Sequence, residues 1–141
     1  MVGRRPRARP AHGRRRGWVD VAHLGHFAPQ FDGGTAAADS ALASGATAVV
    51  AYNDLIALGL LRAFAARGVA VPARISVLGC DDIPMSAMTH PALSTIALPT
   101  IETGRVAVAQ LFSMFGWADA APERVLPTEL VLRETTGPPA G

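Results

Sequence analysis

Lysine is missing from this 141-residue sequence, and cysteine occurs once, as Cys80. A single cysteine cannot close a disulfide within the chain, and it cannot supply a cysteine-based zinc site. No apolar run approaches the roughly 18 residues of a membrane-spanning segment, and no apolar stretch follows the first arginines as in a secretory signal. We therefore expect a cytoplasmic protein without membrane contact, and we interpret Cys80 as a small apolar filler at a strand end.

Short enzyme motifs are also missing. The sequence contains no Gly-x-Gly-x-x-Gly, no phosphate-binding Walker loop and no Gly-x-Ser-x-Gly. Asp81 and Asp82 are consecutive, and the side chains of sequence neighbours seldom face the same way. His23, His26 and His90 have no spacing that indicates a metal site. We therefore expect no enzyme, no metal and no cofactor.

The net charge of +2 conceals an asymmetry. Residues 1–16 hold seven of the thirteen arginines and no acidic residue, so residues 17–141 carry six arginines against eleven acids, a net charge of −5. The first 17 residues are rich in arginine and proline and have no periodic apolar pattern, which predicts a disordered tail. An alternative interpretation is an arm that binds nucleic-acid phosphates.

The centre of the sequence, residues 47–82, reads as strand, helix, strand. Residues 47–52 form a short apolar run rich in β-branched residues, and residues 75–78 form a second one. Between them, residues 55–67 hold helix formers, and Gly68 follows where a C-terminal helix glycine belongs. Two strands joined through one helix lie parallel, by a right-handed crossover.

Polar residues follow both of these strands. Asn53 comes after the first and Asp81 after the second. Parallel strands end at the same edge of the sheet, and ligands of open α/β sheets bind outside the carboxyl ends of the strands. The pattern therefore predicts an amide and a carboxylate side by side at a crevice. The alternative is that Asn53, or Asp54 beside it, only caps the helix and that Asp81 only forms a turn.

The remaining segments extend the α/β pattern to an open, mostly parallel sheet flanked by helices. Residues 83–91 are expected to form a long loop or one helical turn, and residues 137–141 a frayed end. Further strands are expected at residues 19–24, 92–98 and 125–133, and further helices at residues 35–44 and 100–115.

The helix expected at residues 55–67 is apolar around most of its circumference. Its only charged residues are Arg62 and Arg67. A surface helix shows one apolar stripe, whereas a helix that is apolar nearly all round is covered on both sides. The sheet covers one side, and either a second subunit or another part of the chain covers the other. We favour the second subunit and expect a homodimer through residues 55–67 and the 83–91 loop.

Five motifs carry a family resemblance. They are Ala-Val-Val-Ala-Tyr-Asn-Asp-Leu-Ile-Ala-Leu-Gly from residue 48, Gly-Val-Ala-Val-Pro from residue 68, Ile-Ser-Val-Leu-Gly-Cys-Asp-Asp from residue 75, Pro-Ala-Leu-Ser-Thr-Ile from residue 91 and Leu-Pro-Thr-Glu-Leu-Val-Leu-Arg-Glu-Thr-Thr from residue 126. In order and spacing they resemble the C-terminal part of the lactose/galactose repressor family (LacI/GalR). The resemblance implies one lobe of a type I periplasmic-binding-protein-like domain, which senses a small effector, often a sugar or a nucleobase, for a transcription regulator.

The resemblance also implies four effector contacts. Asn53 and Asp81 match such contacts, and the chemistry fits a sugar, because an ionised Asp accepts two hydroxyls while an Asn both donates and accepts. Phe27 matches an aromatic that packs on the ligand. Arg14 matches the arginine of an Arg-x-x-Gly-aromatic motif that reaches the ligand, although only eight residues separate Trp18 from Phe27 where the family has a full helix.

Other parts of the family pattern do not occur in the sequence. There is no helix-turn-helix head, most of the N-terminal lobe is absent, and Leu98 falls where the family often has a polar residue. The helix at residues 100–115 would belong to the absent lobe and would lack its sheet. We therefore expect residues 18–136 to form a partial effector-binding domain that binds effector weakly or not at all. DNA binding would require a head domain outside this sequence.

The preferred interpretation is an effector-sensing and dimerising fragment of a LacI/GalR-like transcription regulator, with a sugar as its ligand. A solute-binding protein of a sugar transporter shares the fold, but it would need a signal peptide or a lipid-attachment cysteine near the start, and the sequence shows neither. A truncated remnant without function is the third possibility.

Overall fold

The computed structural model describes residues 20–119, 122 and 124–139. In these residues three α-helices, one short 3-10 helix and four strands follow one another along the chain. In order they are α1 (Phe31–Ala43), β1 (Ala48–Val50), α2 (Asp54–Ala66), β2 (Ser76–Asp81), η1 (Pro84–Ala87), β3 (Ser94–Ala97), α3 (Thr100–Met114) and β4 (Glu129–Val131). The expected α/β class is confirmed. The predicted tail, including Arg14, lies outside the described residues.

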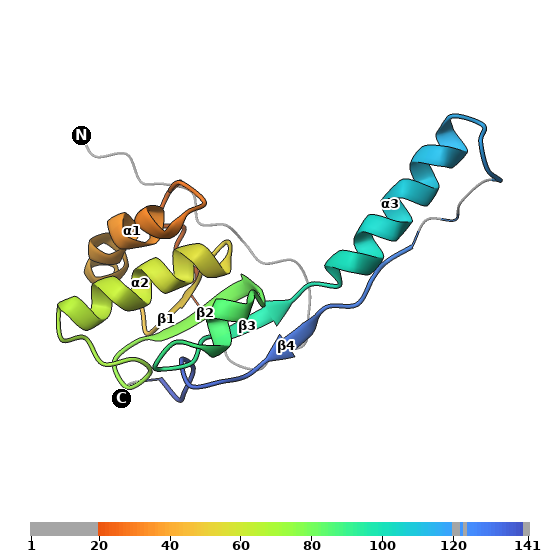
Figure 1. Cartoon of the computed structure of the whole chain (residues 1–141). Helices are drawn as coiled ribbons and strands as arrows, with labels where there is room; N and C mark the ends of the chain where they lie inside the picture. Colours follow the sequence, from red (N-terminus) through yellow and green to blue (C-terminus); the bar gives the residue numbers. More distant parts are fainter. Residues whose placement is uncertain (1–19, 120–121, 123, 140–141) are drawn as a thin grey trace, which may run out of the picture.

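The four strands form one sheet in the order β1-β2-β3-β4 (Figure 1). β1, β2 and β3 are parallel, and β4 pairs antiparallel with β3. The parallel pair predicted around the central helix is therefore confirmed. The three parallel strands direct their carboxyl ends to the same edge of the sheet, where the candidate site was expected.

Helix α2 lies between the sheet and α1. Its residues Ala57, Leu60 and Phe64 are fully buried, because α2 packs on β2 on one side and on α1 on the other (Figure 1). The prediction that a second subunit covers this helix is therefore wrong, since α1 of the same chain supplies the cover. The buried face of α1 consists of small residues, which are Gly33, Gly34, Ala37, Ala38 and Ala41.

The two helices meet at a pair of glycines. A Cβ atom on Gly34 would overlap the backbone carbonyl oxygen of Ile56, and one on Gly59 would overlap that of Phe31. A Cβ on Gly59 would also lie 2.9 Å from the Cα atom of Gly34. The two helix backbones are therefore in direct contact, which only residues without side chains allow.

Several predicted bounds need correction. Helix α1 begins at Phe31 rather than at residue 35, so residues 32–34 lie inside the helix. Residues 20–24 form no strand, and Val21 is 80% exposed. No strand among the described residues offers this segment a ladder of backbone hydrogen bonds. β4 is shorter than the predicted strand at residues 125–133, because the chain before it runs beside α3, beyond the sheet (Figure 1).

The segment after β4 fastens the amino ends of β2 and β3. Thr135 is fully buried, and its hydroxyl donates to the carbonyl oxygen of Val77 (2.7 Å) while it accepts from the N–H of Ser94 (2.8 Å). The N–H of Gly137 donates to the hydroxyl of Ser76 at 3.1 Å. Gly137, where the frayed end was predicted to begin, is therefore bonded to β2.

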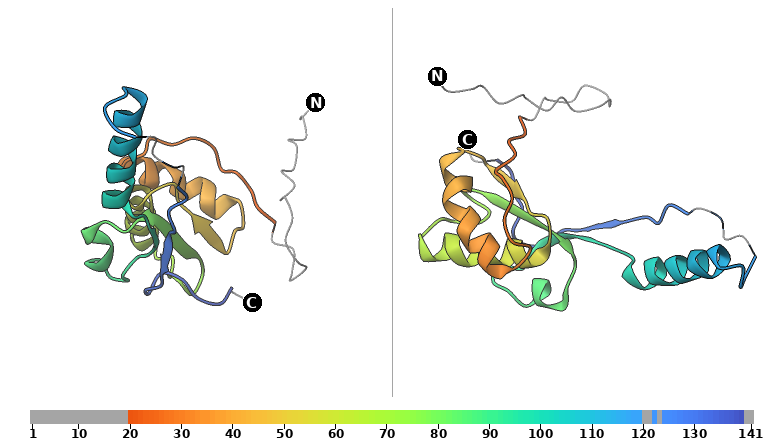
Figure 2. Two further views of the ribbon diagram at one scale, coloured as in Figure 1. Left: turned by 90° about the vertical axis from the view of Figure 1, so that its right-hand side faces the viewer. Right: turned by 90° about the horizontal axis from the view of Figure 1, so that it is seen from above.

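Helix α3 stands apart from the rest of the described chain. It contains no buried residue, and Figures 1 and 2 show it running away from the carboxyl edge of the sheet. A helix at residues 100–115 without a sheet to pack on was predicted, and the described structure confirms that arrangement. None of the described helices has the length and apolar character needed to cross a membrane.

Candidate functional site

The candidate site lies at the carboxyl edge of the three parallel strands. Asn53 stands three residues past β1, Asp81 is the last residue of β2, and Leu98 follows β3. The register pairs Asp81 with Ala97, so Leu98 lies one residue beyond the level of Asp81. The strand order therefore brings these residues to one edge, as the sequence predicted.

Asn53 is the N-cap of α2. Its Oδ1 atom accepts a hydrogen bond from the N–H of Ile56 (2.9 Å), and its Nδ2 donates to the carbonyl oxygen of Pro29 (3.1 Å). The cap interpretation of Asn53 is therefore confirmed. These two bonds fix the orientation of the amide, which still has one N–H and one oxygen lone pair to offer.

Asp81 has an unusual backbone conformation and differs from the neighbouring carboxylates in its side-chain hydrogen bonding. Its backbone lies in the left-handed region with φ = 118°, a conformation that costs a non-glycine residue on the order of 1–3 kcal/mol. Within the described part of the chain, its carboxylate makes none of the hydrogen bonds that engage the neighbouring carboxylates Asp54 and Asp82. Desolvation, together with the negative charge of Asp54, raises the pKa of the Asp81 carboxyl group.

Asp54 connects three segments at this edge through buried hydrogen bonds. It is fully buried, and its Oδ2 atom accepts from the N–H of Ile83 (3.0 Å) and the hydroxyl of Ser86 (2.5 Å). Its Oδ1 atom accepts from the hydroxyl of Thr95 (2.5 Å). A Cβ atom on Gly79 would overlap Oδ1, so only glycine on β2 leaves space for this carboxylate. The sequence marked Asp54 only as a possible helix cap.

Asp82, which follows β2, forms an ion pair with Arg133, which follows β4. An Arg133 guanidinium nitrogen lies 2.7 Å from Oδ1 of Asp82, and a second one donates to the carbonyl oxygen of Leu93 (2.8 Å). The two charged side chains are 20% and 28% exposed, so this pair is shielded more than a surface ion pair. The Asp82 carboxylate is therefore engaged within the chain, whereas no side-chain hydrogen bond of Asp81 occurs among the described residues.

Phe27 lies half-buried in the loop before α1. It packs against the hydrophobic core, and the bond from Asn53 to Pro29 holds its loop at the start of α2. Of the four predicted contacts, Asn53 and Asp81 thus lie at the carboxyl edge of the sheet, and Phe27 lies in the loop that Asn53 holds. The fourth, Arg14, lies outside the described residues.

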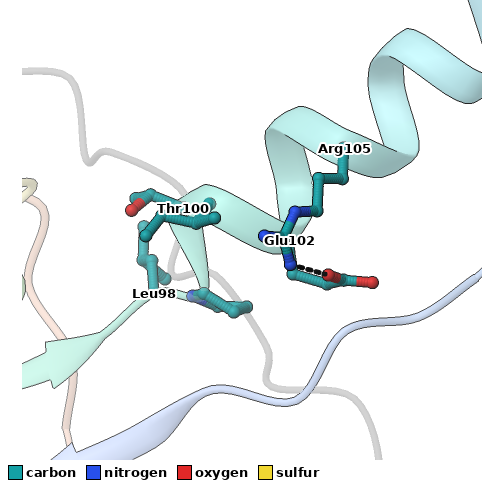
Figure 3. Close-up of a pocket in the computed structure, with 6 residues that line it drawn as sticks. Leu98, Thr100, Glu102 and Arg105 are labelled. Atoms are coloured by element: carbon teal, nitrogen blue, oxygen red, sulfur yellow. Dashed lines mark ion pairs between the residues drawn. The ribbon is translucent and has the colours of Figure 1, made fainter.

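A shallow depression continues from the site onto α3. It has a volume of about 350 Å³, and Leu98, Thr100, Glu102 and Arg105 line it, with Glu102 and Arg105 paired at 3.7 Å (Figure 3). Neither Asn53 nor Asp81 lines it. In residues 20–119, 122 and 124–139 no three His, Cys, Asp or Glu side chains gather closely enough to hold a metal ion.

Comparison with known sequences identifies one family. The family described as periplasmic binding protein-like domain matches residues 1–136. The chain is 38% identical over 124 residues to the HTH-type transcriptional regulator MalR of Streptomyces coelicolor, which covers 87% of this chain and 36% of that protein. It is 36% identical over 93 residues to the lactose operon repressor of Rhizobium radiobacter, which covers 66% of this chain and 82% of that sequence.

Solved structures agree with the sequence matches. A LacI family transcriptional regulator from Enterococcus faecalis with bound ribose superposes with a TM-score of 0.71 at 33% identity, covering 79% of this chain and 42% of that one. A LacI family regulator from an Arthrobacter species in complex with lactose has a TM-score of 0.64 at 34% identity, covering 77% and 42%. The chain also spans 39% of the length of the regulator reg1 of Streptomyces lividans, and thus less than half of most of these relatives.

Proposed function

The chain belongs to the periplasmic binding protein-like family, in the group formed by LacI-type transcription regulators, and we propose that it senses a small effector, a sugar, at the carboxyl edge of its sheet. The observation that carries the proposal is the Asp81 carboxylate, which is half-buried and makes no side-chain hydrogen bond among the described residues. The solved relatives with bound ribose and lactose support a sugar as the ligand class.

The proposed binding chemistry follows from what each side chain has left to offer. The two oxygens of Asp81 accept hydrogen bonds from adjacent hydroxyls of the sugar, and the amide of Asn53 gives one more donor and acceptor. Phe27 packs against an apolar face of the ring. Leu98 contributes a further apolar contact rather than a hydrogen bond. Neither Asn53 nor Asp81 lines the depression described above, so weak binding is expected.

Asp81 should be essential for sugar binding. Isothermal titration with a panel of pentoses, hexoses and disaccharides should give heat with the wild-type chain and none with Asp81→Ala. The loss of one charge-assisted hydrogen bond costs about 1.5–3 kcal/mol, or roughly 10- to 150-fold in affinity, and Asp81 makes two. Asp81→Asn should also bind more weakly, although asparagine tolerates the left-handed backbone of this position.

Protonation of the Asp81 carboxylate should weaken sugar binding, as Asp81→Asn should. The pKa of Asp81 is raised, so its carboxylate becomes protonated, as the pH falls, before an ordinary carboxylate does. A protonated carboxyl loses acceptor capacity, and sugar affinity should therefore fall as the pH falls through that pKa in every variant that keeps Asp81. Asp39→Ala, which removes an exposed carboxylate of α1, is the matched control and should bind like the wild type. Equal heat from Asp81→Ala would reject the site.

The proposal also extends to the whole regulator. We propose that the chain acts in the cytoplasm, uses no cofactor, catalyses no reaction and reaches DNA only through a head domain of the kind its relatives' names indicate. We keep the 83–91 loop as a proposed contact between two copies, since Met85 and Met88 are 49% and 80% exposed there. α2 no longer supports that contact, because α1 covers it.

A further inference from the structure

The chain leaves β2 through a corner of two strained residues. Asp81 and Asp82 have φ angles of 118° and 54°, and no other residue except glycine has a positive φ in the part of the chain that the structure describes. A residue keeps such a conformation only where the surrounding contacts fix it. A short side chain follows the orientation of its backbone, so the contacts that fix this corner also decide where the Asp81 carboxylate points.

Contacts hold the corner at its start, its middle and its end. The ladder with β3 holds Asp81 at the start. The N–H of Ile83 donates to the buried carboxylate of Asp54 (3.0 Å) at the end. Between them, the carboxylate of Asp82 forms its ion pair with Arg133 at 2.7 Å. The ion pair is thus the only one of these contacts made by a side chain of the corner itself.

Arg133 is itself fixed by hydrogen bonds to the start of β3. A second guanidinium nitrogen donates to the carbonyl oxygen of Leu93 (2.8 Å), and the backbone N–H donates to the hydroxyl of Ser94 (2.9 Å). The guanidinium group is a rigid, planar fork, so the bond to Leu93 also fixes the nitrogen that faces Asp82. Arg133 therefore ties the corner to a neighbouring strand and does more than balance a charge.

We propose that Arg133, acting through Asp82, is a positioning residue of the effector site, which holds the corner in the conformation that presents the Asp81 carboxylate to the sugar. This proposal rests on the proposed function, since the carboxylate that Arg133 orients is the one proposed to bind the effector. Binding groups must lie within about 0.5 Å of their productive positions. Without the guanidinium the Asp82 side chain is free, the corner relaxes toward an extended backbone, and the Asp81 carboxylate turns away.

Nuclear magnetic resonance reads the corner without any sugar. The three-bond coupling between the amide and α hydrogens depends on φ, and at φ = 118° it lies far below the value of an extended residue. In Arg133→Met, which keeps the length of the side chain and removes its donors, the Asp81 coupling should rise toward the extended value. Asp82→Asn keeps a weaker, neutral acceptor for Arg133 and tolerates the left-handed backbone, so it should give a smaller rise.

Calorimetric titration with ribose and with lactose adds the functional measurement. Affinity for the sugar that gives heat with the wild type should fall about tenfold in Arg133→Met, as for the loss of one hydrogen bond of the carboxylate. Arg133→Lys keeps the charge without the planar fork and should restore part of the affinity. Arg67 is the matched control, because it also pairs with a carboxylate, Asp39 (2.9 Å), and donates to a carbonyl oxygen, that of Ala63 (3.0 Å). Arg67→Met should keep the wild-type affinity and the wild-type Asp81 coupling.

Circular dichroism identifies the variants that remain folded. An unchanged Asp81 coupling in folded Arg133→Met overturns the proposal, and so do equal losses of affinity in Arg133→Met and Arg67→Met. If Arg133→Met does not fold, Asp82→Asn decides in its place, and an unchanged coupling there overturns the proposal. A wild type that gives no heat rejects the proposed sugar site, whereas the coupling tests the corner without sugar, so the two failures are distinguishable.

Discussion

Asp54→Ala should destabilise the fold by about 3–5 kcal/mol, more than any other single removal of a polar side chain that the structure describes. The carboxylate of Asp54 is fully buried and accepts from the N–H of Ile83 and the hydroxyls of Ser86 and Thr95. Alanine leaves a cavity and three donors without an acceptor, and each unsatisfied buried donor costs about 1–3 kcal/mol. Urea unfolding followed by circular dichroism measures the loss as a lower midpoint at an unchanged slope.

Two further variants separate the hydrogen bonds from the negative charge. Asp54→Asn keeps the volume and one acceptor for the N–H of Ile83, while the two hydroxyls can rotate, so it should cost less than Asp54→Ala. Asp39→Ala removes an exposed carboxylate that pairs with Arg67, and it should change the unfolding free energy by less than about 1 kcal/mol. An Asp54→Ala midpoint equal to that of Asp39→Ala would contradict the central role of Asp54.

The role of Asp54 could not be predicted from the sequence alone. Asn53 and Asp54 both suit a helix N-terminus, and the sequence does not say which one caps α2. The structure gives the cap to Asn53, because the donors that claim Asp54 come from residues 83, 86 and 95, on two later segments. Such a choice depends on long-range contacts, whereas the position of Asn53 and Asp81 at one sheet edge followed from the local order of strand, helix and strand.

The cover of α2 escaped prediction for a related reason. The apolar circumference of α2 showed that something packs on both sides, and that part was correct. The covering face of α1 consists of glycine and alanine, which give a weak apolar signal in a sequence. The strand expected at residues 19–24 failed differently, since its apolar residues had no partner strand among the described residues. Local pattern thus predicted which segments are apolar, and tertiary contact decided what covers them.

Gly59→Ala should destabilise the protein by about 2–3 kcal/mol, although alanine is the better helix former. The helix propensity of alanine exceeds that of glycine by about 1 kcal/mol. Against that gain, the new methyl group would overlap the carbonyl oxygen of Phe31 and lie 2.9 Å from Gly34, and both contacts are rigid backbone. The helices α1 and α2 must separate, which opens gaps along a tightly packed contact. Thermal unfolding should show a lower midpoint.

Glycine-to-alanine substitutions at other positions separate the effect of the contact between α1 and α2 from the effect of helix propensity. A Cβ atom on Gly104 of α3 would meet nothing within 4 Å, so Gly104→Ala should leave stability unchanged or raise it by up to about 1 kcal/mol. Gly34→Ala should resemble Gly59→Ala, because its methyl group would overlap the carbonyl oxygen of Ile56. In the double variant the second methyl group enters a contact that the first has already opened. The double variant should therefore lose less unfolding free energy than the two single variants lose together. Full additivity would show that the glycines act separately and not as one contact between α1 and α2.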